Sequence, residues 1–338
     1  MATGFVGDRR QFLGRTAIAL AAAQVSSPLL GQTESAESPM LAALKQVPAG
    51  VLDVGYAEFG PREGPPVILL HGWPYDIHSF AEVAPDLAQR GFRVIVPFLR
   101  GYGTTQFRSP ETMRNGQQAA FALDVIDLMD ALSISRAVIA GFDWGARTAN
   151  IVAALWPDRC RAHVSVSGYL IGSQAANQAP LAPRAELAWW YQFYFATERG
   201  RRGYDANRKD FARLIWQTAS PKWNFDEITF ERSAQAFDNP DHLAIVIDNY
   251  RWRLGLTEGE ARLEPYEQRL AQMPDITVPT VTLEGDANGA PHPDPTSYAA
   301  KFRGPYVHRL IEGGIGHNLP QEAPRAFSDA ISEAIALV

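Results

Sequence analysis

Short runs of β-branched and apolar residues alternate with helical hydrophobic patterns along the chain after residue 50. This alternation predicts a sheet whose strands are joined by crossover helices. Apolar residues at helical spacing predict one helix from Phe121 to Leu132 and a closing helix from Phe327 to Ile335. We expect strands at 51–59, 67–70, 92–98, 137–141, 163–167, 277–284 and 307–311.

One long segment interrupts this alternation. From Tyr169 to Met273 the sequence contains no convincing strand, yet the segment holds 17 of the 36 Trp, Tyr and Phe residues of the chain. We therefore expect a helical cap at 169–273, inserted between two parts of one α/β core at 50–168 and 274–338.

The first residues resemble an export signal. Arg9 and Arg10 precede a Phe-Leu pair and an apolar run at 16–23, which is far shorter than the roughly 20 residues that span a bilayer. This order is typical of a twin-arginine signal. We expect residues 1–37 to be that signal and a linker, with an undetermined cleavage site, and the protein to be periplasmic or secreted without a stable membrane span.

Composition narrows the classes of function. A chain of 338 residues with 46% hydrophobic and 20% charged residues is typical of a globular protein with a full core. The formal net charge is −6, and the Lys and Arg residues are scattered along the sequence, so it predicts no basic patch of the kind that binds nucleic acid. Cys160 is the only cysteine, and the histidines lack ligand spacing, so we expect no metal site and no cofactor. The expected partner is a small molecule, and the oligomeric state stays open.

The most informative motif is the pentapeptide Gly-Phe-Asp-Trp-Gly at 141–145. It lies between a predicted strand and a predicted helix, where its two glycines permit a sharp turn that exposes Asp143 above the sheet. By itself the string fits equally well an Asp that caps the next helix.

Three further motifs follow predicted strands. His71-Gly72-Trp73-Pro74 lies where a hydrolase places an N–H group of its oxyanion hole, Asp286 follows the strand at 277–284, and His317 follows the last strand. The order nucleophile, acid, histidine is that of the α/β-hydrolase fold. Glu284 is a reserve candidate for the acid.

Together these motifs resemble the epoxide hydrolase and dehalogenase branch of the α/β-hydrolases, over nearly all of the chain from about residue 50. The loop at 99–103 is also similar to that branch, although Phe98 stands where an acidic residue is common. The resemblance implies a cis bond between Trp73 and Pro74. It also implies that Tyr191 and Tyr250, in two segments that resemble the cap tyrosine motifs, donate protons to an epoxide oxygen.

An Asp nucleophile points to chemistry at a saturated carbon, because a carboxylate is already ionised at neutral pH. We expect an alkyl ester on Asp143, hydrolysed by water that His317 activates while Asp286 orients the imidazole. The N–H groups of Trp73 and Trp144 would bind the oxyanion. The expected substrates are water and a small apolar or aromatic epoxide, bound by Trp73, Trp144 and Trp190.

Other interpretations stay open. Haloalkane dehalogenases also carry a Trp after the nucleophile, where this chain has Trp144. Fluoroacetate dehalogenases resemble the chain at Arg147, but they place a second arginine directly after the nucleophile. Both tyrosines also fit ordinary core aromatics. A homologue that binds a ligand without turnover is a third interpretation.

Overall fold

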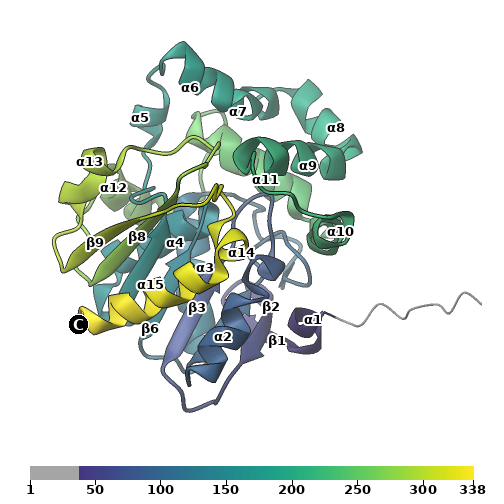
Figure 1. Ribbon diagram of the computed structural model, residues 1–338. Helices are drawn as coiled ribbons and strands as arrows, with labels where there is room; N and C mark the ends of the chain where they lie inside the picture. Colours follow the sequence, from purple (N-terminus) through teal and green to yellow (C-terminus); the bar gives the residue numbers. More distant parts are fainter. Residues whose placement is uncertain (1–37) are drawn as a thin grey trace, which may run out of the picture. The chain divides into compact units, whose positions relative to one another are not determined.

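The computed structural model describes residues 38–338, so the predicted signal at 1–37 lies outside the described residues. A nine-stranded sheet forms the centre, in the order β1-β2-β4-β3-β6-β7-β8-β9, with β5 paired to β2 (Figure 1). The strands from β4 to β9 in this order pair in parallel. β2 pairs antiparallel with both of its neighbours, β1 and β4. The strands are β1 (Leu44–Ala49), β2 (Leu52–Phe59), β3 (Pro66–Leu70), β4 (Arg93–Pro97), β5 (Gln106–Phe107), β6 (Ala137–Gly141), β7 (Cys160–Val166), β8 (Thr280–Gly285) and β9 (Tyr306–Ile311).

The seven predicted strands are confirmed, with shifted ends. β6 has the predicted bounds, whereas β7 begins three residues before the predicted start at His163, and β8 begins three residues after the predicted start at Thr277. The sequence did not predict β1 or β5. β1 is an edge strand that contains Lys45, Gln46 and Pro48, and such residues suit an edge but weaken the apolar pattern of a strand.

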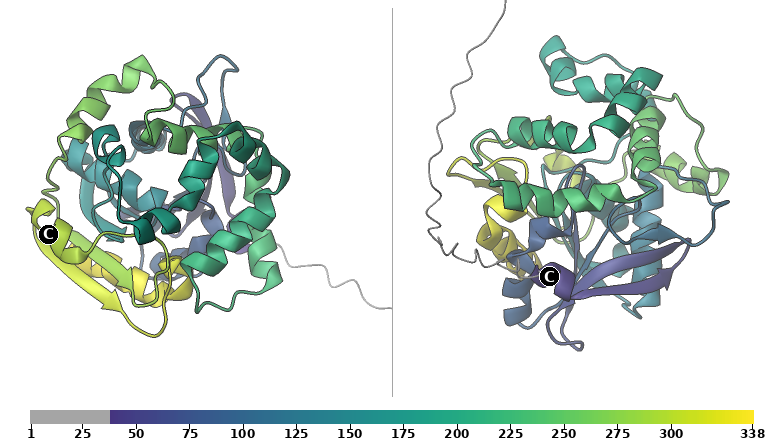
Figure 2. Two further views of the ribbon diagram at one scale, coloured as in Figure 1. Left: turned by 90° about the horizontal axis from the view of Figure 1, so that it is seen from above. Right: turned by 90° about the vertical axis from the view of Figure 1, so that its right-hand side faces the viewer.

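Helices cover both faces of the sheet. Helices α2 (Val83–Gln89) and α15 (Pro324–Ala336) pack together on one face, and α3 (Gln118–Ala131) and α4 (Trp144–Leu155) pack together on the other (Figures 1 and 2). The apolar stripe predicted for α3 is buried, as is Phe327 on α15. Because both faces are covered, the inner strands β3 and β6 are almost wholly buried.

The chain between β7 and β8 consists of helices joined by loops and contains no strand, as the strand-free sequence predicts (Figure 1). None of the helices among residues 38–338 is both long and apolar enough to cross a bilayer. The helices of this segment are α5 (Gln174–Asn177), α6 (Pro183–Ala188), α7 (Trp190–Phe195), α8 (Glu198–Ala206), α9 (Arg208–Ala219), α10 (Glu227–Ala234), α11 (His242–Arg253) and α12 (Glu264–Ala271).

Aromatic side chains join the helical segment to the sheet. Phe195, Tyr204 and Trp216 are fully buried, and burial of each such side chain stabilises the fold by about 2–3 kcal/mol. Two of the hydrogen bonds that cross the boundary come from indoles: Trp73 Nε1 donates to Tyr204 Oη at 2.9 Å, and Trp216 Nε1 donates to the carbonyl of Pro74 at 2.8 Å. These two bonds therefore hold the loop after β3 against the helical segment.

Candidate active site

Asp143 lies on a strained turn between β6 and α4. Its backbone has φ +53° and ψ −125°, a conformation that a non-glycine residue seldom adopts. Gly145 makes the turn possible, because a Cβ there would lie 1.9 Å from the carbonyl oxygen of Leu70 on β3. The sequence thus forms the sharp elbow that the pentapeptide predicts.

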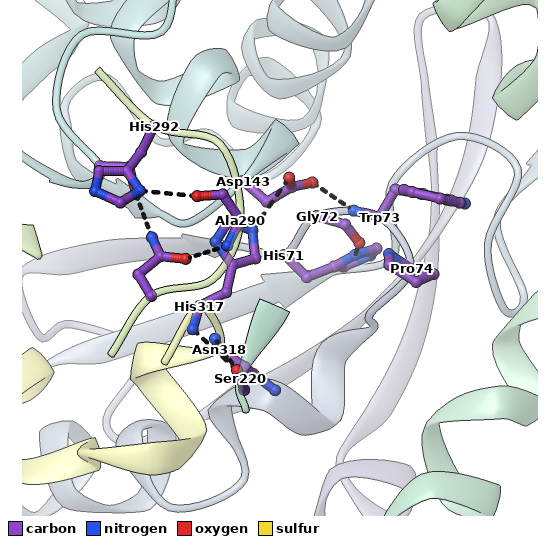
Figure 3. Close-up of polar contacts among 12 residues, drawn as sticks. His71, Gly72, Trp73, Pro74, Asp143, Ser220, Ala290, His292, His317 and Asn318 are labelled. Carbon is purple, nitrogen blue, oxygen red and sulfur yellow. Dashed lines mark hydrogen bonds and ion pairs between the residues drawn. The ribbon is translucent and has the colours of Figure 1, made fainter. Parts of the chain in front are cut away.

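The Asp143 side chain faces two donors from distant parts of the chain. Its Oδ1 accepts a hydrogen bond from the backbone N–H of Trp73 at 2.7 Å, and its Oδ2 lies 3.3 Å from Nε2 of His317 (Figure 3). It makes no capping bond to α4, so the alternative in which Asp143 only caps this helix does not describe the structure. The carboxylate is 22% exposed and remains open to a cavity.

Ionisation of Asp143 is favoured although its surroundings are largely dry. Burial would raise the pKa of the carboxyl group, but the hydrogen bond and charge of His317 and the N–H groups of Trp144 and Trp73 outweigh it. The pKa of Asp143 therefore lies below its ordinary value, and the group is an anion at neutral pH.

The loop after β3 is shaped to hold the Trp73 N–H in place. A Cβ at Gly72 would lie 2.3 Å from Asp143 Oδ1, so only glycine lets the loop approach the carboxylate. Burial lowers the pKa of His71 to about 4, so its ring is neutral. Nδ1 of that ring donates to the Gly72 carbonyl at 3.0 Å, and Nε2 accepts from Leu99 N–H at 3.1 Å. The Trp73–Pro74 bond is cis, as the family resemblance implies.

The structure does not bring Asp286 to the imidazole of His317. The Asp286 carboxylate is exposed and accepts hydrogen bonds from three backbone N–H groups of the turn after β9, those of Gly313, Gly314 and Ile315, at 2.7–3.2 Å. The turn removes part of the hydration of this carboxylate, which raises its pKa, but the three donors outweigh that effect and hold the pKa of Asp286 below its ordinary value. The expected contact is corrected accordingly: three close N–H groups satisfy this carboxylate, which supports the loop that carries His317.

The reserve acid, Glu284, makes no hydrogen bond with His317 either. It is buried at the end of β8, where Oε1 accepts from Asn288 Nδ2 at 2.7 Å. Its Oε2 atom and the Nδ1 atom of His317 both lack a hydrogen-bond partner among residues 38–338. The His317 loop is anchored instead by its backbone, since His317 N–H donates to Ser220 Oγ at 2.9 Å (Figure 3).

Both predicted tyrosines line the same cavity as Asp143 and His317. This cavity has a volume of about 1300 Å³ and lies between the helical segment and the ends of the parallel strands. Tyr191 comes from α7 and Tyr250 from α11, and their ring centroids are 5.5 Å apart at 84°. Burial, followed by neighbouring negative or phenolic groups, raises the pKa of both phenols, so both stay protonated at neutral pH.

The three tryptophans predicted to bind substrate have different positions. Trp73 and Trp144 line the cavity, whereas Trp190 does not. Trp190 is 38% exposed and packs on Phe211, with ring centroids 5.3 Å apart. Successive residues point about 100° apart on a helix, so Trp190 cannot share the direction of Tyr191. The neighbouring Trp189 lines the cavity instead.

Sequence reasoning also missed Arg253, which lines the cavity together with Arg147. The available signal was its position on α11, three residues after Tyr250, which places both on one helix face.

No group of three His, Cys, Asp or Glu side chains gathers at metal-binding distance among the described residues.

The elbow after β6, the histidine after β9 and the N–H donor after β3 together define an α/β-hydrolase. Residues 65–203 match the family model for the alpha/beta hydrolase fold. A crystal structure of a candidate epoxide hydrolase from Klebsiella pneumoniae subsp. pneumoniae is 62% identical, with a TM-score of 0.88, and the match covers 89% of this chain and 99% of that chain. This chain therefore belongs to the α/β-hydrolase family.

Curated relatives have similar names. Epoxide hydrolase B of Mycobacterium tuberculosis is 36% identical over 152 residues, a match that covers 41% of this chain and only 42% of that relative. Epoxide hydrolase A of the same organism is 27% identical over 311 residues, covering 82% of this chain and 92% of that relative.

Proposed function

We propose that this protein hydrolyses an epoxide to a vicinal diol through a covalent alkyl ester on Asp143. One observation carries the proposal: an ionised carboxylate and two protonated phenols line one cavity, with His317 beside the carboxylate. The names of the relatives support the same activity.

Ring opening needs a nucleophile and an acid at the same time. Oδ1 of Asp143 is held by the Trp73 N–H, so Oδ2 is the oxygen that attacks an epoxide carbon. The carbon–oxygen bond of the ring breaks, and the departing oxygen takes a proton from Tyr191 or Tyr250. An alkoxide is basic enough to take this proton even from phenols whose pKa is raised.

Hydrolysis of the ester uses His317 and a water molecule. His317 Nε2 takes a proton from water, and the resulting hydroxide adds to Cγ of Asp143. The oxyanion on Oδ1 stays beside the Trp73 and Trp144 N–H groups. When the intermediate collapses, the bond from Cγ to the alkyl oxygen breaks, and His317 protonates the diol. The remaining water proton restores the phenol through solvent.

The halide-releasing alternatives fit the site less well. A halide is held by N–H donors, but the Trp73 indole N–H already donates to Tyr204, which is bonded in turn to His242 at 2.9 Å. Of the tryptophans in the two motifs around Asp143, only Trp144 has an indole N–H without a hydrogen-bond partner among residues 38–338. Dehalogenation also gives no role to Tyr191 and Tyr250, since a halide leaves without a proton.

A product panel tests the proposal. The purified protein is given styrene oxide, 1-bromobutane and bromoacetate, and both diol and free halide are measured. We expect diol from styrene oxide and no halide above background, with loss of diol in Asp143→Asn. Halide release without diol would contradict the proposal, and an Asp143→Asn variant with full activity would support a non-catalytic role. Export through the twin-arginine route stays a prediction.

A further inference from the structure

The wall of the cavity carries two arginines that lack a carboxylate partner. Arg147 is 7% exposed, and among residues 38–338 its guanidinium makes a single long hydrogen bond, 3.5 Å from Nη2 to Asn249 Oδ1. For Arg253 no side-chain hydrogen bond is found within the same described range, and neither arginine forms an ion pair there. Arg253 is half-buried. Arginines removed from water are normally paired, so a buried and a half-buried guanidinium without partners in one cavity call for an anion from outside the chain.

Their positions relate the two charges to the reacting groups. Arg147 follows Asp143 by four residues and lies on the first turn of α4, about 6 Å further along the helix axis. Arg253 follows Tyr250 by three residues on α11, so both face the same side of that helix. The backbones of Arg147 and Arg253 therefore lie about one helical turn from those of Asp143 and Tyr250.

The neighbouring acidic groups do not neutralise this pair. Glu267, the other carboxylate whose charge acts on Arg147 besides Asp143, accepts hydrogen bonds from Ala119 N–H at 3.0 Å and from Gln118 Nε2 at 3.1 Å. Burial raises its pKa to about 7, so its negative charge is incomplete at neutral pH. Asp143 is held by Trp73 and His317.

A small polar chamber opens between the two arginines. Its volume is about 20 Å³, enough for one water molecule or one carboxylate oxygen, and it shares Arg147 and Arg253 with the main cavity. The amide side chains of Gln118, Asn177 and Asn249 complete its polar lining. Planar guanidinium groups match a planar carboxylate in two-point contacts.

Arg253 is also held in a fixed orientation. Its guanidinium carbon lies 4.5 Å from the centre of the Trp189 ring and 5.7 Å from that of Tyr250. Such stacking uses the face of the guanidinium and leaves its N–H edge free to donate. Burial, together with the neighbouring Arg253 charge, lowers the pKa of Arg147 to about 10, so Arg147 still carries its charge at neutral pH.

We infer that Arg147 and Arg253 form a carboxylate subsite, and that the epoxide hydrolysed by this protein carries a carboxylate group close to its ring. The inference rests on the proposed function and makes its substrate class more specific: an epoxy acid with an apolar body.

Binding of an unreactive acid tests the subsite without turnover. The affinities of cinnamate and of the neutral cinnamamide for the full chain are measured by calorimetry. Charge-assisted hydrogen bonds are worth about 1.5–3 kcal/mol, which corresponds to about 10–100-fold in affinity. We expect cinnamate to bind at least about 10-fold more tightly than the amide, and Arg253→Gln to abolish that difference.

Arg251→Gln is the matched control, because Arg251 lies on the same helix but does not line the cavity. It removes the same charge and should leave the preference for cinnamate unchanged. Arg253→Lys, which keeps the charge but not the fork, should retain part of it. Equal affinities for acid and amide, no detectable binding of cinnamate, or an equal loss in Arg251→Gln would each overturn the inference.

Turnover measurements distinguish a failure of the carboxylate subsite from a failure of the proposed epoxide hydrolysis. The wild-type protein is compared on 3-phenylglycidate, which is an epoxy acid, and on styrene oxide. We expect a higher kcat/KM for the acid, mainly through a lower KM. If both epoxides give diol with equal kcat/KM, the subsite is wrong while epoxide hydrolysis stands. If cinnamate binds through Arg253 but no epoxide gives a diol, hydrolysis is wrong while the subsite stands.

Discussion

At the residue scale, the site depends on opposite ionisation of neighbouring acids. Asp143 is half-buried yet ionised, because His317 and two N–H groups stabilise its charge. Tyr191 and Tyr250 share its cavity and stay protonated, because burial and nearby Asp143 disfavour a phenolate. The proposed nucleophile and the two proposed acids can thus coexist at one pH.

Replacing either tyrosine by Phe should slow ring opening. We expect Tyr191→Phe and Tyr250→Phe each to lower the alkylation rate by about 10–100-fold, and the double variant to lose more, because general acids contribute about 10²–10⁴-fold. Stopped-flow Trp fluorescence in single turnovers measures this rate. Since both phenol pKa values are raised, the wild-type rate should not fall as pH rises to 10.

Tyr194→Phe is the control for that experiment, because Tyr194 lies on α7 but does not line the cavity. If the two cavity variants alkylate as fast as Tyr194→Phe, the phenols are not the proton donors.

At the element scale, the proposed catalytic groups lie where parallel strands end. Asp143 follows β6, Trp73 follows β3 and His317 follows β9, so the sheet brings distant segments together. The turn after β9 is tied to the end of β8 by the Asp286 carboxylate and to the end of α9 by Ser220. The position of His317 therefore depends on backbone anchors.

This geometry predicts a modest effect of Asp286→Asn. An amide oxygen can still accept the two shortest N–H bonds, those of Gly314 and Ile315, so the loop should persist. We expect ester hydrolysis to slow by no more than about 10-fold, with alkylation unchanged, whereas loss of a direct partner of a catalytic histidine costs about 10⁴-fold. Pre-steady-state kinetics resolve the two steps. A loss as large as that of His317→Ala would restore Asp286 as the orienting acid.

The sequence predicted local features better than contacts between distant segments. The elbow at 141–145 and the loop at 71–74 were predictable because flanking glycines and strand ends dictate them locally. The contact of Asp286 was not, because three N–H groups of a turn 27–29 residues away decide it. Arg253 was missed for a similar reason: its lack of a partner is visible only in the folded chain.

At the scale of the whole molecule, burial of one acid links stability to pH. Glu267 on α12 bonds to the start of α3, and burial raises its pKa from an ordinary 4.5 to about 7. The unfolded chain therefore releases this proton first, and the free energy of unfolding falls as pH rises from about 4.5 to 7.

Glu267→Gln removes this titration. Relative to the wild type, the variant should gain stability between pH 5 and pH 8, by at most about 3 kcal/mol for the full shift. Chemical denaturation at both pH values measures the gain, with Glu264→Gln as an exposed control on the same helix. A difference from the wild type that does not change with pH would contradict the buried, titrating state of Glu267.

The proposed mechanism requires that Asp143 forms a covalent ester and that its carboxyl group takes up an oxygen from water. A single turnover with excess enzyme in ¹⁸O-water, followed by mass spectrometry of the peptide that contains Asp143, tests this uptake. We expect one ¹⁸O in the Asp143 carboxyl group and none in the diol. A labelled diol with an unlabelled peptide would contradict it, because water would then have attacked the epoxide itself.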